Sequence, residues 1–122
     1  IGMNKAMQSI TSHKNSSVVL KVDNEYRNIP ISSIIYCEAE DKYQRFYLEK
    51  DERLFIRISG TELYKKLSEF ESFYRCGRAH IINLEHISRV TSDGAAFKNG
   101  TLLKLPRTVL AGLRKAFFDY FN

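Results

Sequence analysis

Short β-prone segments separated by turn residues are the feature that most restricts how this chain can fold. Runs rich in branched and aromatic side chains recur about every eight to twelve residues, a spacing typical of a β-rich domain rather than of alternating strands and helices. Asn99-Gly100 is the dipeptide most typical of a two-residue hairpin turn, and Asp23-Asn24 is a second turn signal. We predict strands at residues 18–22, 26–31, 34–37, 45–48, 54–58, 86–91, 95–98 and 101–105.

Two helices are expected beside these strands. Residues 59–62, Ser-Gly-Thr-Glu, fit a capping box, in which the serine hydroxyl accepts a hydrogen bond from the amide of Glu62. Thr108 is the expected N-cap of a final helix that follows Pro106. In both segments apolar side chains then share one helical face: Leu63, Leu67 and Phe70 in the first, and Leu110, Leu113 and Phe117 in the second. The predicted fold class is mainly β, with one short internal helix and one C-terminal helix.

The boundaries of the domain follow from composition. Residues 1–17 are rich in Ser, Asn, Lys and Thr without a sustained period, so we interpret them as a flexible linker or leader. Residues 18–122 then form one domain, which suits a chain of 122 residues. Because the sequence starts at Ile1, we expect it to be part of a longer protein. Residues 72–83 mix aromatic, basic and apolar side chains, and their apolar residues follow neither the period of 2 of a strand nor the period of 3.6 of a helix.

Charge is divided unevenly along the chain. Residues 18–72 carry nine basic and eleven acidic side chains, whereas residues 73–122 carry eight basic and three acidic ones. The net charge of +5 is therefore concentrated in the C-terminal half and at the start of the chain. A basic half joined to a neutral-to-acidic half is typical of a domain that turns one face to a polyanion. A solvated basic surface without a partner is the alternative.

Motifs for catalysis are absent from the sequence. It contains no glycine-rich phosphate loop, no Cys-x-x-Cys, no His-Glu-x-x-His and no Gly-x-Ser-x-Gly. The acidic residues Glu38, Glu40 and Asp41 are explained more simply as surface acids at a strand end than as an acid–base or Mg²⁺ cluster. We therefore expect neither enzymatic activity nor a cofactor.

The two cysteines do not form a disulfide framework in a chain of this size. We interpret Cys37 and Cys76 as buried thiols of a protein in the reducing cytoplasm, with a bond between them as an alternative. A weaker alternative is a zinc site that begins from the i,i+4 pair Cys76 and His80, with Cys37 or His86 brought in by folding. No apolar run is long enough to cross a bilayer, and none resembles a signal peptide.

Three segments combine base-reading side chains with positive charge at breaks between predicted elements: residues 41–45, 78–83 and 106–108. Asn and Gln match the adenine edge in the major groove, and the Arg fork matches guanine. We predict base contacts by Gln44, Asn83 and Arg107. Alternatively, Gln44 is an exposed strand residue, Asn83 caps a turn, and Arg107 merely precedes a helix. The predicted backbone contacts are Lys42, Arg45, Arg78, Lys104 and Thr108.

The order of these segments resembles the LytTR-type DNA-binding domain of LytR/AlgR-family bacterial response regulators. The resemblance covers about residues 18–121 and rests on residues 38–43, 57–59, 73–84 and 105–107. The most specific stretch in that family runs roughly Phe-x-Arg-x-His-Arg-Ser-Tyr/Phe-Ile/Val-Val-Asn. This chain keeps Phe73, Arg75, Arg78, Ile81 and Asn83, and differs at Gly77, Ala79 and His80. Near the end of the chain it also has Pro106 where the family commonly has a Ser before the Arg.

The resemblance implies an elongated stack of small antiparallel β-sheets whose loops enter successive major grooves. By position, it also implies that the base-reading loops end at Gln44, Asn83 and Arg107. It further implies a receiver domain upstream, a two-component phosphorelay, and dimers on repeated promoter half-sites, with the isolated domain a monomer. Gly77 and Ala79 lack side chains that would touch phosphate, which weakens the phosphate contacts expected around Arg78.

The sequence is also compatible with two alternatives to duplex binding. The first is a β-rich protein-interaction or ligand-sensing module, in which Tyr43, Phe73 and Tyr74 would line a groove. The second is binding of single strands or RNA by stacking of bases on exposed aromatic rings.

Overall fold

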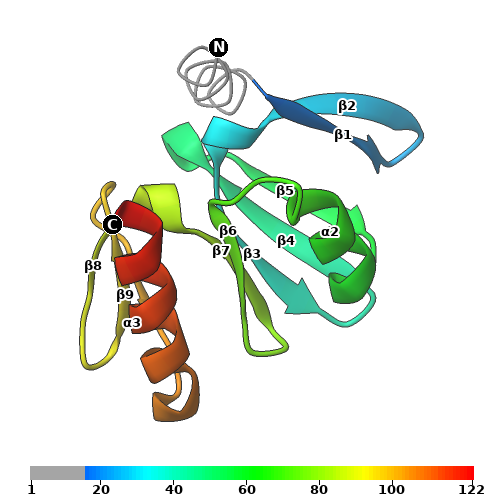
Figure 1. Ribbon diagram of the computed structural model, residues 1–122. Coiled ribbons are helices and arrows are strands. Elements are labelled where there is room, and N and C mark those ends of the chain that lie inside the picture. Colours follow the sequence, from blue (N-terminus) through cyan, green and yellow to red (C-terminus); the bar gives the residue numbers. More distant parts are fainter. Residues whose placement is uncertain (1–15) are drawn as a thin grey trace, which may run out of the picture.

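Three antiparallel sheets and two α-helices make up residues 16–122, which are the residues that the computed structural model describes (Figure 1). The first sheet is the hairpin of β1 (Ser17–Val22) and β2 (Glu25–Pro30). The third sheet has the order β10-β9-β8 and consists of β8 (Ile87–Val90), β9 (Gly94–Phe97) and β10 (Leu102–Lys104). The prediction of a mainly β fold with a short internal and a C-terminal helix is confirmed.

The middle sheet has five strands in the order β5-β4-β3-β7-β6. Its strands are β3 (Ile34–Glu40), β4 (Tyr43–Leu48), β5 (Arg53–Arg57), β6 (Phe73–Cys76) and β7 (His80–Asn83). The helix α2 (Gly60–Leu67) lies on one face, and α3 (Arg107–Phe121) lies on the other side of the β6–β7 hairpin (Figure 1). Short 3₁₀ turns join several strands: η1 (Ile31–Ser33), η2 (Glu49–Asp51) and η3 (Leu84–His86).

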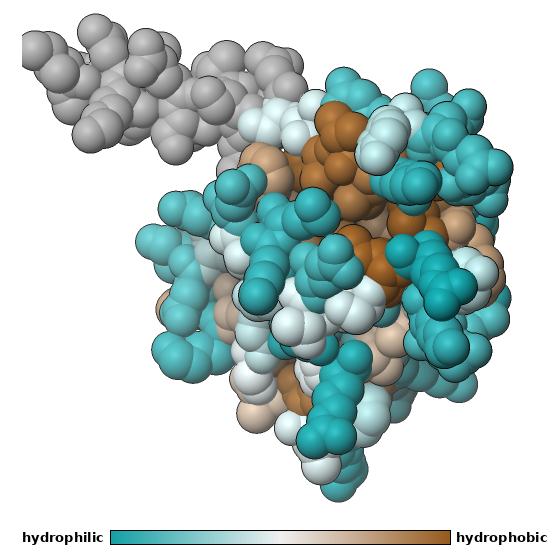
Figure 2. Space-filling model, turned by 90° about the vertical axis from the view of Figure 1, so that its right-hand side faces the viewer, coloured by the Kyte–Doolittle hydropathy of each residue, from teal (hydrophilic) through white to brown (hydrophobic). Residues whose placement is uncertain are grey.

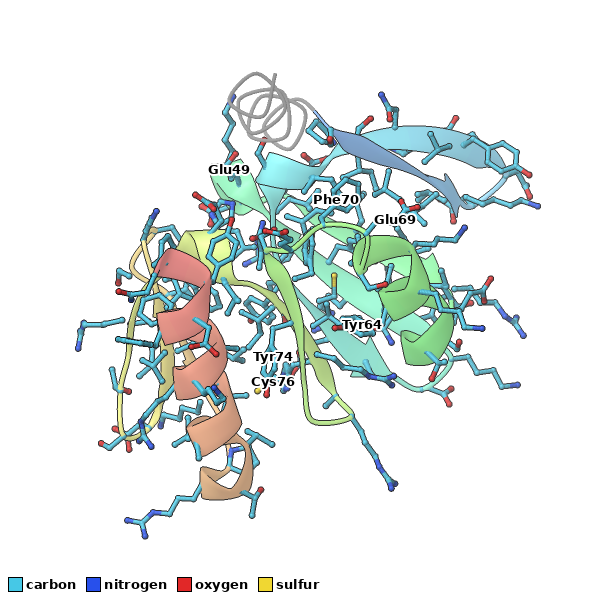
Figure 3. The ribbon with its side chains drawn as sticks, viewed as in Figure 1. Glu49, Tyr64, Glu69, Phe70, Tyr74 and Cys76 are labelled. Carbon is cyan, nitrogen blue, oxygen red and sulfur yellow. The ribbon has the colours of Figure 1, made fainter. Side chains whose placement is uncertain are left out.

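The middle sheet separates two hydrophobic cores, because successive side chains of a strand point to opposite faces. Cys37 and Phe46 belong to the core shared with α2 and the β1–β2 hairpin. Tyr36 and Ile82 belong to the core shared with α3 and the third sheet. Figure 3 shows Tyr74 and Cys76 between the β6–β7 hairpin and α3, with Tyr64 of α2 on the other side of that hairpin.

The segment without a clean period, residues 72–83, is the β6–β7 hairpin. Three of the four residues of β7 are buried, so the alternation that would identify a strand in the sequence is missing. The predicted Ser59 cap is confirmed, since its hydroxyl accepts from the Glu62 amide at 3.0 Å. The expected Thr108 cap is wrong: α3 begins at Arg107 with Pro106 as its N-cap and no side-chain cap bond.

The predicted leader, residues 1–17, lies almost wholly outside the described residues. Its last two members belong to the domain instead, because Ser17 starts β1 opposite Pro30 and the Ser16 carbonyl accepts from the Ile31 amide at 2.9 Å. No helix among the described residues is both long and apolar enough to cross a membrane.

The two cysteines are buried free thiols in different cores, so the alternative of a disulfide between them is wrong. Burial raises the pKa of Cys76 to about 11 and raises that of Cys37 as well. Cys76 and His80 face each other across the hairpin rather than along a helix. Among residues 16–122 no three His, Cys, Asp or Glu side chains are placed to hold a metal ion.

Candidate nucleic-acid interface

One edge of the molecule collects two of the turns that join strands of the middle sheet, while the β4–β5 turn, η2, lies at the opposite end of these strands. The β3–β4 turn at Asp41-Lys42 and the β6–β7 turn at residues 77–79 both lie at the lower edge in Figure 1. The Ala39 amide donates to the Ala79 carbonyl at 2.7 Å, which ties the end of β3 to the second turn.

Both helices begin at this edge. The start of β4 pairs with the end of β5, Tyr43 opposite Arg57, and α2 follows β5 after only two residues. The start of α3 lies against the β6–β7 turn, since a Cβ on Gly77 would be 3.2 Å from Val109 Cγ1. The N-terminus of a helix carries a partial positive charge, so both helix dipoles favour an anion at this edge.

Cations project from the same turns. Lys42 lies in the β3–β4 turn, Arg78 in the β6–β7 turn and Arg107 at the first position of α3, and all three side chains are exposed. None of them forms an ion pair with any residue between 16 and 122. Lys104 and Thr108, the other predicted backbone contacts near α3, are exposed as well. Figure 2 shows one side of the molecule, which is mostly hydrophilic and ends at the bottom in a hydrophilic tip.

Arg45 lies near the edge, but its guanidinium already has partners within the domain. Its guanidinium pairs with Glu40 at 2.5 Å and lies 5.5 Å above the ring centre of Phe55. The Phe55 ring also stacks on Tyr43, with ring centres 4.7 Å apart. A phosphate that binds Arg45 must therefore compete with the carboxylate of Glu40.

Asn83 is not placed to read a base, and the prediction that assigned it this role is not supported by the structure. Its side chain is only 1% exposed and lies at the end of β7 that is farther from the turn. The amide nitrogen donates to the Ile34 carbonyl at 2.8 Å, and the amide oxygen accepts from the Glu85 amide at 3.1 Å. Asn83 thus caps the turn η3, which is the alternative that its position before Leu84 suggested.

Gln44 is also buried, with 3% of its surface exposed, so the second predicted base contact is not supported either. Along β4 the side chains of Gln44, Phe46 and Leu48 are buried, and those between them are partly exposed. Gln44 therefore faces α2, while Tyr43 and Arg45 face the opposite side of the sheet. Phe46 and Leu48 are apolar positions two residues apart. Continuing this spacing back along the strand to residue 44 predicts that Gln44 lies on the same buried face.

The aromatic residues proposed to line a ligand groove do not meet in one place. Phe73 is buried in the first core, Tyr74 packs against the second, and Tyr43 stacks on Phe55. The described residues do form an open cleft of about 710 Å³, whose polar and charged lining includes Glu49, Lys50, Asp51, Glu85, His86 and Lys98. Ile35 is the one apolar residue that lines this cleft, whereas a ligand pocket is usually lined mainly by apolar and aromatic side chains.

The fold and its edge define a class of protein: a mainly β domain that presents exposed cations and two helix N-termini on one side. The LytTr DNA-binding domain family matches residues 24–118, and the chain belongs to this family. A similar solved structure is a "LytTr DNA-binding domain of putative methyl-accepting/DNA response regulator from Bacillus cereus". It is 26% identical, with a TM-score of 0.66, over 84% of this chain and 96% of that one. No protein of curated function matches the chain.

Proposed function

We propose that this domain binds duplex DNA sequence-specifically, as the output domain of a bacterial two-component response regulator. The observation that carries the proposal is the set of three exposed cations, Lys42, Arg78 and Arg107, at one edge of a LytTR-family fold. Their charges are not compensated by ion pairs within residues 16–122, so they are free to replace the counterions of DNA phosphates. The turns that carry them would enter successive major grooves.

The position and chemistry of each side chain at this edge suggest whether it contacts a base or a phosphate. Arg107 and Arg78 each present a planar fork that matches O6 and N7 of guanine, and each projects at the end of an element or turn. We assign base contacts to Arg107 and, in place of Asn83, to Arg78. Lys42, Lys104 and Thr108 contact the phosphate backbone, and Arg45 does so where a phosphate displaces Glu40.

Regulation of this domain would come from the rest of the protein. A receiver domain upstream of residue 1 would dimerise on phosphorylation and place two copies on repeated promoter half-sites in the cytoplasm. Pairing raises the effective concentration of the second copy, so a domain that binds weakly alone becomes a tight regulator. The isolated domain is then a monomer, and light scattering at micromolar concentration tests this: a stable dimer would contradict it.

Selection of bound sequences from a random duplex pool at a fixed salt concentration tests the proposal directly. We expect a short motif to be enriched, and a duplex carrying it to compete better than the same strand alone. Equal competition by the single strand would favour the alternative in which bases stack on exposed rings such as Phe55, which is 45% exposed. Failure to enrich any motif would exclude sequence-specific reading.

A further inference from the structure

The first turn of α2 offers free hydrogen-bond donors at the cationic edge. The Ser59 hydroxyl satisfies the Glu62 amide, and the Ser59 carbonyl accepts from Leu63. The amides of Gly60 and Thr61 form no hydrogen bond with the residues that the structure describes. Such amides at a helix start, together with the helix dipole, favour an anion.

Arg75 extends from β6 to the same place. Its Nη1 donates to Thr61 Oγ1 at 3.4 Å, and its Nη2 lies 3.2 Å from the position that a Cβ on Gly60 would occupy. Arg75 forms no ion pair within residues 16–122, so its charge is uncompensated beside the helix start. Because Gly60 has no side chain, no Cβ stands between the helix start and the guanidinium.

The buried Gln44 is the second, independent sign of a ligand here. Only 3% of its surface is exposed, and its side-chain amide forms no hydrogen bond within residues 16–122; the little exposure that it keeps leaves the amide within reach of a group from outside. Its Nε2 points to the same space, 3.5 Å from the position of a Cβ on Gly60. An acceptor that reaches this amide from outside would replace its solvent contact with a well-oriented hydrogen bond.

We propose that Gly60, Thr61, Arg75 and Gln44 form a notch that binds one phosphate group of the DNA backbone. The inference rests on the proposed function, because it names the chemical group of the same partner that this notch would hold. The charge in the first turn of α2 is Glu62, which opposes an anion, while Arg57 pairs with Tyr43 at the end of β5 and so points to the opposite face of the sheet. With Glu62 so near, the notch suits the single charge of a phosphodiester better than a doubly charged phosphate.

Binding of a duplex measured against salt concentration tests the notch. We expect Arg75→Gln to weaken binding about tenfold, to the same extent on the selected sequence and on random DNA, and to reduce the salt slope by about 1. Arg75→Lys keeps the charge but not the fork, so it should retain the slope and lose part of the affinity. Arg53→Gln is the matched control, because Arg53 starts β5 at the other end of the strand and lies over Tyr47. Equal salt slopes in Arg75→Gln and the wild-type domain would overturn the inference.

Gly60→Ala separates a role in binding from a role in folding. Alanine is the better helix former, so the variant should be at least as stable as the wild-type domain. Its Cβ would lie 3.2 Å from the Arg75 guanidinium and close the notch, so DNA binding should weaken several-fold. Unchanged binding in a stable Gly60→Ala domain contradicts the notch.

Titration with inorganic phosphate alone, followed by NMR, needs no DNA. We expect the Gly60 and Thr61 amides and the Gln44 side-chain amide to shift in the wild-type domain and to stay in place in Arg75→Gln. If these shifts occur but no duplex is bound, the notch is an anion site and the proposed function fails. If duplex binds and phosphate shifts none of the three amides in the wild-type domain, the proposed function survives and the notch does not.

Discussion

The side-chain amide of Asn83 donates a 2.8 Å hydrogen bond to the carbonyl of Ile34, a residue 49 positions earlier in the chain. The bond joins the end of β7 to the beginning of β3, the strand beside it in the middle sheet. Together with the bond from the Glu85 amide, it engages both ends of an amide that is almost wholly shielded from water. Asn83 therefore stabilises the junction between the middle sheet and the third sheet.

Replacing Asn83 by alanine should therefore destabilise the fold. The Ile34 carbonyl and the Glu85 amide would lose their partner, so the free energy of unfolding should fall by about 1–3 kcal/mol, as measured by urea denaturation. Below the unfolding transition, the preference for the selected DNA sequence over random DNA should be unchanged. A variant of normal stability that has lost this preference would restore Asn83 as a base reader.

Arg107→Ala should reduce affinity selectively. We expect a loss of about 1–3 kcal/mol on the selected duplex and little loss on random DNA, because a bidentate contact to guanine discriminates between bases. Arg114→Ala is the control, since Arg114 is an exposed cation two turns further along the same helix. Fluorescence anisotropy with both duplexes measures the difference. An equal loss on every sequence would reassign Arg107 to the phosphate backbone.

Glu40→Gln should strengthen DNA binding. The substitution removes a negative charge from the edge and releases the Arg45 guanidinium from a 2.5 Å ion pair. Affinity should rise a few-fold on the selected duplex and on random DNA alike, and the salt slope should steepen by up to about 1. The control is Asp119→Asn, which releases Lys115 on the last turns of α3. Unchanged affinity and slope in Glu40→Gln would show that Arg45 does not contact phosphate.

The stability of the domain should fall at alkaline pH because of its buried thiols. Burial raises the pKa of Cys76 to about 11 and raises that of Cys37 too, whereas the pKa of a cysteine in the unfolded chain is about 8.5. Below that value both states hold the proton and the pH has no effect through these groups. As the pH rises from about 8.5 towards 11, the unfolded chain releases protons that the folded one retains, so unfolding becomes more favourable.

Urea denaturation between pH 8 and pH 10 measures this effect. We expect the decline in the free energy of unfolding to be smaller in the Cys37→Ala, Cys76→Ala double variant than in the wild-type domain. The native wild-type protein should also resist alkylation at pH 8, since both thiols are buried and protonated. Rapid alkylation without unfolding would contradict the burial of these groups.

Much of the fold could be predicted from local patterns. The turn at Asn99-Gly100, the Ser59 cap and the alternation in β4 and β5 each depend on residues close together in the chain. The concentration of positive charge in the C-terminal half and the exposure of Arg107 were likewise predictable, because a cation beside a proline and a helix start has no local partner.

The roles of Asn83 and Gln44 were decided only by the tertiary structure. The sequence by itself determined where most strands and turns occur, except in the β6–β7 hairpin, and which side chains of a strand share a face. It did not determine which faces become covered, because that depends on packing between segments far apart in the chain. Asn83 is enclosed by η1 and η3 and is withdrawn from the edge, whereas Gln44 is covered by α2 and keeps only its amide at the start of that helix. Arg75 reaches the same place from a strand fourteen residues away.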